Sequence, residues 1–381
     1  MEFEFATAGR VVVGVGRADD LGTVVVGLGS RAIVLTGSHP TRHAGLLSNL
    51  NLPYTLSTVD FEPAVEAAGA AVAAARDHGA DVVVAIGGGS VLDLGKAVAV
   101  LLTNGGDPLD YLEVIGRGKP LTRPGLPCVA VPTTAGTGSE VTANAVLTSP
   151  EHGVKVSLRG PLVLPRLALV DPLLTVDCPP SVTASSGLDA LTQCLEPFVS
   201  PRANPLTDCL AREGMLRAGR GLLRAYADGS DLEARTHMAV CSLFGGLALA
   251  NATLGAVHGF ASAIGGAARV PHGMACAALL VPVVEANLRA LRSRDPDNPA
   301  IGRYAEAARM ITGDPNASTA DGVDWLRMMV ERLRVPRLGE YGVGPTMADD
   351  IVAKAATANS TQGNPIALTT DELQAVFAAA I

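Results

Sequence analysis

The sequence predicts an α/β domain with a mostly parallel sheet over residues 1–178 and an all-helical domain over residues 179–381. In the first part, short Val/Ile-rich runs alternate with helix-like runs, which is typical of βαβ units whose sheet is covered on both faces. After Pro179 and Pro180, apolar residues recur at helical spacing and strand-like runs become rare. A chain of 381 residues also exceeds the roughly 150 residues expected of one domain.

The elements of the first domain follow in order. Strands are expected at residues 31–36, 81–86 and 128–131, where β-branched residues run without polar alternation. Helices are expected at residues 65–78 and directly after Ser90. We therefore expect an open, mostly parallel sheet.

The second domain is expected to consist of helices joined by short connections. Apolar residues recur at helical spacing in four long segments. These are residues 183–198, 207–225, 232–249 and 275–291.

Composition narrows the possible partners. Hydrophobic residues make up 48% of the chain and charged residues 17%, which supplies apolar surface for packed cores. A net charge of -8 without a block of Lys or Arg predicts no nucleic-acid partner and no anionic membrane surface. The start of the chain is not that of a secretory signal, and no apolar run reaches about 18 residues. We therefore expect a soluble, cytoplasmic protein.

The cysteines are widely spaced and form no CxxC pair, so buried reduced thiols without chemistry are expected. They are Cys128, Cys178, Cys194, Cys209, Cys241 and Cys276.

A glycine turn follows the strand expected at residues 81–86. The turn is Gly87-Gly88-Gly89-Ser90, and a helix-like run follows it. Residues without Cβ allow the backbone to approach a pyrophosphate, and the free amides at a helix start favour an anion. This order indicates a dinucleotide site, although it is not the GxGxxG fingerprint and a plain tight turn remains possible. Asp93 belongs to the same site or stabilises the helix dipole.

A second polar loop follows the strand expected at residues 128–131. Thr133 and Thr134 lie in the segment 132–140, which is rich in hydroxyl groups and glycine. Open α/β sheets bind ligands at the carboxyl ends of their strands, so this loop is a second candidate for nucleotide contacts. The alternative is a capped helix start with Thr137 or Ser139 as N-cap.

A few polar residues stand out in the apolar helical half. Asp189 and Gln193 lie one turn apart on one predicted helix face, so they can share a ligand. His258 and His272 are both in glycine-rich apolar surroundings. Two histidines and a carboxylate resemble the ligand set of Zn²⁺ or Fe²⁺. The alternative for each histidine is a buried core residue whose ring nitrogens are hydrogen-bonded within the protein.

Together these motifs resemble the iron-containing (group III) alcohol dehydrogenase family. That family lies within the dehydroquinate synthase-like superfamily, which also includes glycerol dehydrogenases and maleylacetate reductases. The resemblance spans nearly the whole chain. It rests on the two loops, on Lys155, on Asp171-Pro172, on residues 187–196, and on Asn204-Pro205, His258, Pro271-His272-Gly273 and Gly363-Asn364-Pro365.

The resemblance implies a role for individual residues. It implies that Gly87 to Ser90 hold the pyrophosphate of NAD or NADP, that Thr133 and Thr134 lie near the nicotinamide, and that Lys155 contacts the ribose. It also implies that Asp189, His258 and His272 are metal ligands. A catalytic acid or base is not identified.

Two departures concern the metal and the proton relay. Gln193 stands where iron-dependent members have a fourth histidine ligand, and its amide is a weaker donor. The metal could therefore be iron, or zinc as in the glycerol dehydrogenase branch, or be absent as in maleylacetate reductases. Ser262 stands where many members have a proton-relaying histidine, so a relay must use water or another group.

A third departure concerns the cofactor. Gly37 stands where NAD-preferring members have an aspartate, and nearby Arg42 could attract a 2′-phosphate. Use of NADPH is therefore a hypothesis.

The function predicted from all of this is reversible hydride transfer between a nicotinamide cofactor and an alcohol or carbonyl compound, assisted by a divalent metal. The alternatives are a metal-independent reductase of the maleylacetate reductase type, a dehydroquinate synthase-like lyase and a non-catalytic relative. The family also implies a homodimer, with the strand expected at residues 3–13 a candidate to pair between subunits.

Overall fold

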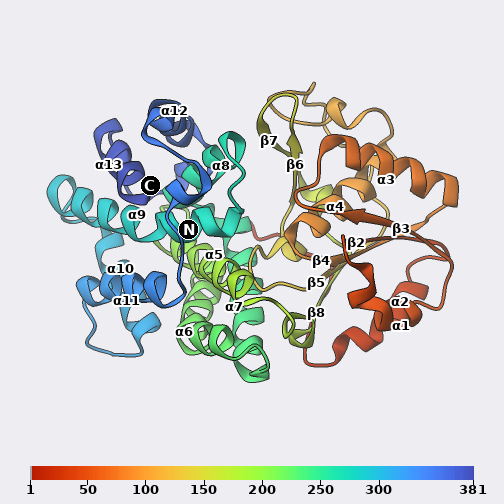
Figure 1. Ribbon diagram of the computed structural model, residues 1–381, viewed down its shortest axis with the longest axis horizontal. Helices are drawn as coiled ribbons and strands as arrows, with labels where there is room; N and C mark the ends of the chain where they lie inside the picture. The colour runs from red at the N-terminus through yellow and green to blue at the C-terminus, as the bar shows by residue number, and fades with distance from the viewer. Residues whose placement is uncertain (1) are drawn as a thin grey trace. The chain divides into compact units, whose positions relative to one another are not determined.

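The structure is a computed structural model that describes residues 2–381. These residues form two compact units (Figure 1). The first unit is built from Ala6–Thr134 and Gly138–Thr175. The second contains Ala135–Thr137, Val176–Ile381 and the described residues before Ala6. The predicted class, an α/β unit followed by a helical unit, is confirmed.

The α/β unit is built on a fully parallel six-stranded sheet. In spatial order the strands are β1 (Val11–Val13), β8 (Leu167–Val170), β5 (Cys128–Pro132), β4 (Val82–Gly87), β2 (Ala32–Gly37) and β3 (Tyr54–Val59). A separate antiparallel pair joins β6 (Asn144–Ser149) to β7 (Val154–Arg159).

Alternate residues of each strand face two different cores, because successive side chains point to opposite faces of a sheet. Ile33, Leu35, Val83 and Ala85 pack with residues of α3 (Val65–His78) and α4 (Gly89–Asn104). Their neighbours along the strands pack with residues of α1 (Leu21–Val26) and α2 (Ala44–Ser48). Figure 1 shows α3 on one side of the sheet and α1 and α2 on the other. Both faces are covered, which explains the uninterrupted Val/Ile runs.

The direction of winding reverses between β2 and β4. From β2 the chain continues to β3 at one edge of the sheet, whereas from β4 it continues to β5 and then β8 in the other direction. The carboxyl ends of β2 and β4 therefore form a topological switch point, where open α/β sheets bind ligands.

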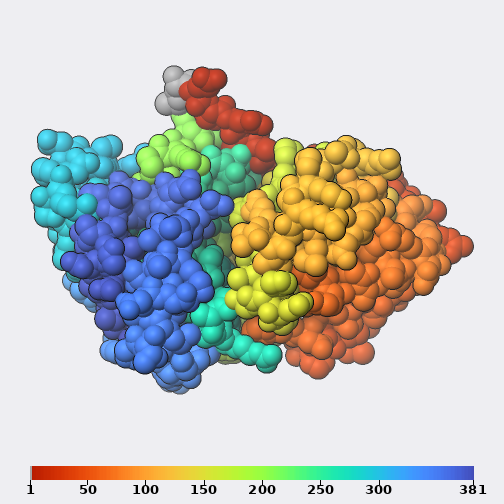
Figure 2. Space-filling view, turned by 90° about the horizontal axis from the view of Figure 1, so that it is seen from above, coloured from red at the N-terminus to blue at the C-terminus, as the bar shows by residue number. Residues whose placement is uncertain are grey.

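The helical unit has a core centred on α5 (Pro180–Val199), which is buried without interruption from Gly187 to Val199. The helices that follow are α6 (Pro205–Ala227), α7 (Leu232–Ala252), α8 (Ala256–Ala267), α9 (His272–Arg294), α10 (Pro299–Thr312), α11 (Thr319–Arg332), α12 (Ala348–Thr357) and α13 (Thr370–Ala380). Helices α6, α7 and α9 pack directly on α5. In Figure 2 the C-terminal residues, in blue, gather on one face of this unit.

Helix α6 illustrates why the helices begin where they do. It starts at Pro205, two residues before the predicted start. The Asn204 side chain accepts from the amides of Leu206 and Thr207, and the Thr207 hydroxyl accepts from the Asn204 amide. This capping box, with proline at the first helical position, fixes the start. The Asn204-Pro205 motif is therefore structural.

One helix of the described chain, α9, is long and apolar enough to cross a membrane. Of its apolar stretch, 72% is buried inside the protein, as in the core helix of a soluble protein. Helices α7 and α8 pass the same criterion only as a pair, which is bent by 97°.

Two expectations were wrong in detail. The N-terminal strand covers only Val11–Val13, and it pairs with β8 of its own sheet. The cysteines are free, but Cys209 is exposed and Cys178 is partly exposed. Cys209 lies on the face of α6 that is turned away from the core. Its exposure therefore follows from its place on the helix and not from the residue type.

Candidate active site

Three helices of the helical unit bring Asp189, His258 and His272 together. Asp189 lies on α5, His258 in the first turn of α8, and His272 is the first residue of α9. His258 Nε2 is 3.2 Å from Asp189 Oδ1, and His272 Nε2 is 4.0 Å from the same oxygen. The two imidazole ring centroids are 5.6 Å apart. The fold thus makes one cluster from residues that are far apart in sequence.

The cluster is closed on one side and accessible on the other. The side chains of Asp189 and His258 are 2% and 4% exposed, whereas that of His272 is 33% exposed. Burial works against ionised Asp189, but the close His258 imidazole and the charge of His272 hold its pKa below the ordinary value. Burial also works against charged His258, but Cys276, Glu196 and Asp189 raise its pKa well above the ordinary value. The surroundings therefore favour positive charge at this point.

The unpartnered atoms of the cluster fit a bound metal. Among the described residues, Asp189 Oδ1, Gln193 Oε1 and His258 Nε2 are buried and have no hydrogen-bond partner. Buried polar atoms are nearly always paired, so unpaired ones at the same place need an explanation. Carboxylate oxygen and imidazole nitrogen are donors that Zn²⁺ and Fe²⁺ accept. A divalent cation would satisfy Asp189 Oδ1 and His258 Nε2, which lie 3.2 Å apart, together.

Glu196 supports His258 from behind. Its Oε2 is 2.6 Å from His258 Nδ1, and its Oε1 accepts from the Val257 amide at 2.7 Å. A Cβ on Gly255 would lie 2.8 Å from Oε1, so a larger residue here would displace the carboxylate from the start of α8. A carboxylate on Nδ1 leaves Nε2 directed toward Asp189, an arrangement that is common behind metal-binding histidines.

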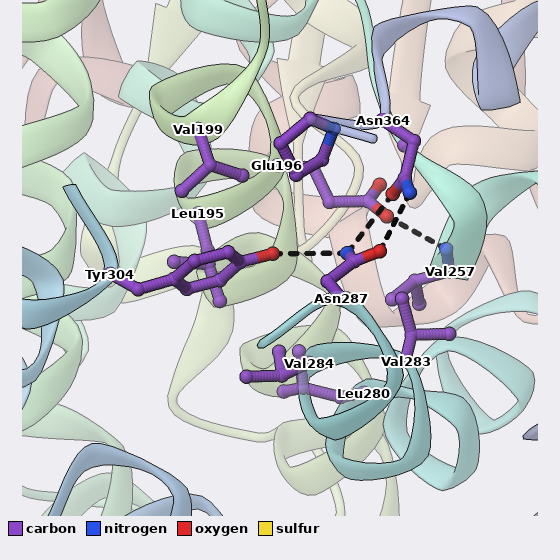
Figure 3. A pocket seen from close by; sticks show the side chains of 12 residues that line it. Leu195, Glu196, Val199, Val257, Leu280, Val283, Val284, Asn287, Tyr304 and Asn364 are labelled. Carbon is purple, nitrogen blue, oxygen red and sulfur yellow. Dashed lines mark hydrogen bonds between the residues drawn. The ribbon is translucent and has the colours of Figure 1, made fainter. Parts of the chain in front are cut away.

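A buried polar chain continues from this point (Figure 3). Asn364 Oδ1 accepts from the Ala256 amide at 3.2 Å and from Asn287 Nδ2 at 3.1 Å. Asn287 Nδ2 also donates to the Tyr304 hydroxyl at 3.0 Å. These groups line a cavity of about 10 Å³, which is about the size of one water. Asn364, from the motif Gly363-Asn364-Pro365, thus helps to hold the first turn of α8.

Gln193 and Ser262, which depart from the family pattern in the helical half, differ in burial. Gln193 is buried on α5, one turn after Asp189, with its Oε1 among the unpartnered atoms. Ser262 is exposed on α8, one turn after His258.

Cys276 belongs to the cluster, although the sequence predicted no chemistry for it. One donor atom each from Asp189, His258, His272 and Cys276 lies within 4.8 Å of all the others. Cys276 follows His272 by one turn of α9, and this spacing of four residues was the available signal.

The predicted pyrophosphate loop lies at the switch point of the sheet. Gly87 ends β4, Gly88 caps α4, and α4 begins at Gly89. A Cβ on Gly87 would lie 2.5 Å from a Val91 methyl, so this glycine permits close packing of helix on strand. Gly88 has no side chain to accept from the first-turn amides, which leaves the start of α4 suited to an anion.

The second loop lies beside the first. The Thr133 amide donates to the Gly87 carbonyl at 3.0 Å, and the Cβ position of Gly88 is 3.3 Å from Thr134 Oγ1. No capped helix follows, because residues Ser139–Val141 form only a short 3-10 turn after Gly138, without a side-chain cap. Both predicted cofactor loops are thus adjacent at the carboxyl edge.

Asp93 and Lys96 hold the second loop in place. Asp93 accepts from Ser139 Oγ at 2.5 Å and from the Val146 amide at 3.0 Å. The fully buried Lys96 Nζ lies 2.9 Å from Asp93 Oδ1 and donates to the Ser139 carbonyl at 2.9 Å. Asp93 therefore positions the loop through Ser139, and it lies beyond the first turn of α4, where a stabilising effect on the helix dipole is small.

The remaining predicted residues lie on the same unit. Lys155, on β7, forms an ion pair with Glu62 at 2.6 Å and is 11% exposed. Gly37 ends β2 and is paired with Val59 of β3. No atom lies within 4 Å of a Cβ placed on Gly37, and Arg42 is exposed on the following turn.

A dinucleotide-binding edge and a buried carboxylate–imidazole cluster are together characteristic of nicotinamide-dependent oxidoreductases. Comparison with known proteins narrows this class. Residues 8–172 match the family described as iron-containing alcohol dehydrogenase, and residues 183–381 match the C-terminal region of the Fe-containing alcohol dehydrogenase family. The chain belongs to the iron-containing alcohol dehydrogenase family.

Individual relatives agree with this assignment. Long-chain-alcohol dehydrogenase 1 of Geobacillus thermodenitrificans is 34% identical over 97% of this chain and 94% of its own. The crystal structure of a 1,3-propanediol oxidoreductase is similar over the whole of both chains, with a TM-score of 0.92 and 30% identity. A sulfoacetaldehyde reductase from Bifidobacterium kashiwanohense, in complex with NAD+, covers 100% of this chain and 99% of its own, with a TM-score of 0.87 and 28% identity.

The protein is therefore an oxidoreductase that uses a nicotinamide cofactor to interconvert alcohols and carbonyl compounds. The predicted family, enzyme class and cofactor type are confirmed.

Proposed function

We propose that Asp189, His258 and His272 hold a divalent metal and that the chain transfers hydride reversibly between NAD(P)H and the carbon of an alcohol or aldehyde. The observation that carries this proposal is the convergence of unpartnered buried donor atoms from α5 and α8, with His272 beside them. Gln193 Oε1 offers a further neutral oxygen on the same helix as Asp189.

A divalent metal in this position supplies a Lewis acid for the substrate oxygen. The residues of the chain fix the position of the metal site. Glu196 holds His258 Nδ1, so that Nε2 faces Asp189, and the α8 start is itself held by Glu196 and Asn364. The partly exposed His272 marks the side from which a substrate enters. Ser262 does not buffer protons near neutral pH, so we propose that a proton leaves through water or a cofactor hydroxyl.

The α/β unit is proposed to bind the cofactor at the switch point. Gly87 to Ser90 and the start of α4 receive the pyrophosphate, and Thr133 and Thr134 contact the nicotinamide end, because these loops adjoin each other at one edge. Lys155 is proposed to contact the ribose while it keeps its ion pair with Glu62. The absence of a carboxylate at Gly37, with Arg42 nearby, supports use of NADPH.

The substrate is proposed to be a primary alcohol or the corresponding aldehyde. The relatives are named for choline, long-chain alcohols, 1,3-propanediol and sulfoacetaldehyde. These compounds differ in size and charge but share a terminal CH₂OH or aldehyde group, which is the part that reacts.

We further propose a cytoplasmic homodimer without a membrane partner. Strand β1 is at one edge of the sheet, and Val13 at its end and Val15 just beyond it are 41% and 48% exposed. Unpaired edges with exposed apolar side chains are places where a second copy of a chain can add. Size-exclusion chromatography with light scattering would give the mass of a monomer if this is wrong.

The proposed function is tested by elemental analysis of protein purified without added metal, together with oxidation of NADH and NADPH by a panel of aldehydes. We expect about one divalent metal per chain and turnover with aldehydes. His272→Ala should lose both the metal and the activity, whereas His237→Ala, which removes an imidazole on α7 beside Glu233, should keep both. Full activity of His272→Ala, or after exhaustive chelation, would contradict the metal-dependent mechanism.

A further inference from the structure

Cys276 is placed as a metal donor would be, although no sequence motif gives it a role in metal binding. Its side chain projects from α9 one turn after His272, so both point from the same helix face. The sulfur lies 3.7 Å from His272 Nε2. It also lies within 4.8 Å of the donor atoms of Asp189 and His258.

Three separations among the four donor atoms are close to those of a tetrahedral site, and the others are below 4.8 Å. Zinc bonds of about 2.0 to 2.3 Å at tetrahedral angles separate neighbouring donors by roughly 3.3 to 3.7 Å. The measured separations are 3.2 Å between His258 Nε2 and Asp189 Oδ1, 3.7 Å between Cys276 Sγ and His272 Nε2, and 4.0 Å between His272 Nε2 and Asp189 Oδ1. These values lie close to that range. Two of these atoms, Asp189 Oδ1 and His258 Nε2, are buried and have no hydrogen-bond partner among the described residues.

We propose that the Cys276 sulfur is the fourth protein donor to the metal, alongside Asp189, His258 and His272. This rests on the proposed metal site and deepens it. The thiol gives up its proton to solvent when the cation binds, as metal-binding cysteines do. The neutral Gln193 amide is then not required as a strong ligand, which gives a physical reason why a weak donor is tolerated at that position.

The donor set predicts which metal is preferred. A thiolate is a soft ligand that selects zinc over the oxygen-preferring cations, and a site with sulfur, nitrogen and oxygen donors is typical of zinc and of its substitute cobalt. Most protein sites already bind Zn²⁺ more tightly than Fe²⁺, so Cys276 should widen this preference and Cys276→Ser should narrow it. Metal content after growth with equal zinc and iron gives a second measure of the same property.

The test is the absorption spectrum of the Co²⁺-substituted protein, with cobalt supplied as the chloride. A thiolate bound to Co²⁺ gives an intense charge-transfer band in the near ultraviolet, which oxygen and nitrogen donors alone do not give. We expect this band in the unmodified protein at one cobalt per chain. It should disappear in Cys276→Ser while the weaker visible bands of bound cobalt persist, with at least about tenfold weaker affinity.

The matched control is Cys209→Ser. Cys209 is exposed on α6 and is the cysteine most open to adventitious cobalt, so a band that this change removes would overturn the proposal. Visible cobalt bands without the charge-transfer band in the unmodified protein would also overturn it, while leaving the metal site intact. Failure to bind cobalt or zinc at all would overturn both this inference and the metal-dependent function. The presence or absence of the charge-transfer band in the unmodified protein already tests the proposal, so a variant that folds poorly does not prevent a result.

Discussion

Glu196 Oε2 lies 2.6 Å from His258 Nδ1, and the same carboxylate accepts the Val257 amide through its other oxygen at 2.7 Å. One carboxylate on α5 therefore fixes both the first turn of α8 and the orientation of the imidazole within it. Groups of this kind behind a ligand commonly change metal affinity by about 10 to 100-fold. Glu196 is thus a positioning residue.

Glu196→Gln should weaken metal binding by about 10 to 100-fold, because an amide removes the negative charge behind Nδ1 while keeping the size of the side chain. The measurement is competition with a chromophoric chelator at constant pH. The control is Glu306→Gln, which removes a carboxylate from the helical unit at its ion pair with Arg212. Equal affinity in the two variants would show that Glu196 only caps α8.

The sequence predicted the fold because its signals are local. Parallel strands buried on both faces read as uninterrupted Val/Ile runs, as at Val82–Gly87, and helices read as apolar repeats. The extent of β1 was overestimated, because only three residues meet β8.

The site was only partly predictable, because its residues meet through tertiary structure. Asp189, His258 and His272 stood out as rare polar residues, but their approach depends on how α5, α8 and α9 pack. For Asp93 the sequence predicts a cofactor contact or a stabilising effect on the helix dipole, because its contacts with Ser139 and Val146 depend on the position of β6. For Cys276 the signal in the sequence is its spacing of four residues from His272, which alone does not distinguish a metal donor from a buried core thiol.

Lys96→Met should destabilise the α/β unit by about 3 kcal/mol, because it breaks an ion pair whose cation is fully buried and leaves the partly buried Asp93 without that cation. It also leaves the carbonyls of Ser139 and Asn144 without this donor. Denaturant unfolding monitored by circular dichroism measures the effect. Lys119→Met is the control: it removes a half-exposed lysine from its pair with Asp110, which Arg117 also contacts, and should change stability little. Equal stability of the two variants would contradict a structural role for Lys96.

Stability should fall as pH rises from about 4.5 to about 7, through Glu140. Burial raises the pKa of this carboxyl from 4.5 to about 7, against smaller opposing effects of its own amide and of Lys96. Between these values the folded chain keeps a proton that the unfolded chain has lost, so the free energy of unfolding decreases by on the order of 3 kcal/mol and then levels off. Urea unfolding at pH 5 and pH 8 measures the difference.

Glu140→Gln should remove this contribution, because the amide is neutral at every pH. Glu151→Gln, at an exposed carboxyl of the same unit, should keep the unmodified slope. A slope that Glu140→Gln leaves unchanged would assign the pH dependence to another group.

Gly37→Asp should raise KM for NADPH by at least about tenfold and leave KM for NADH nearly unchanged, because the new carboxylate repels a 2′-phosphate. The change is sterically free, since no atom lies within 4 Å of the Cβ position. Arg42→Ala should act in the same direction by removing a nearby positive charge. Gly69→Asp is the matched control, because the space at its Cβ position is equally open and it lies on α3, away from the carboxyl end of β2. An unchanged KM for NADPH in Gly37→Asp would place the 2′-phosphate elsewhere and leave Gly37 without a role in cofactor choice.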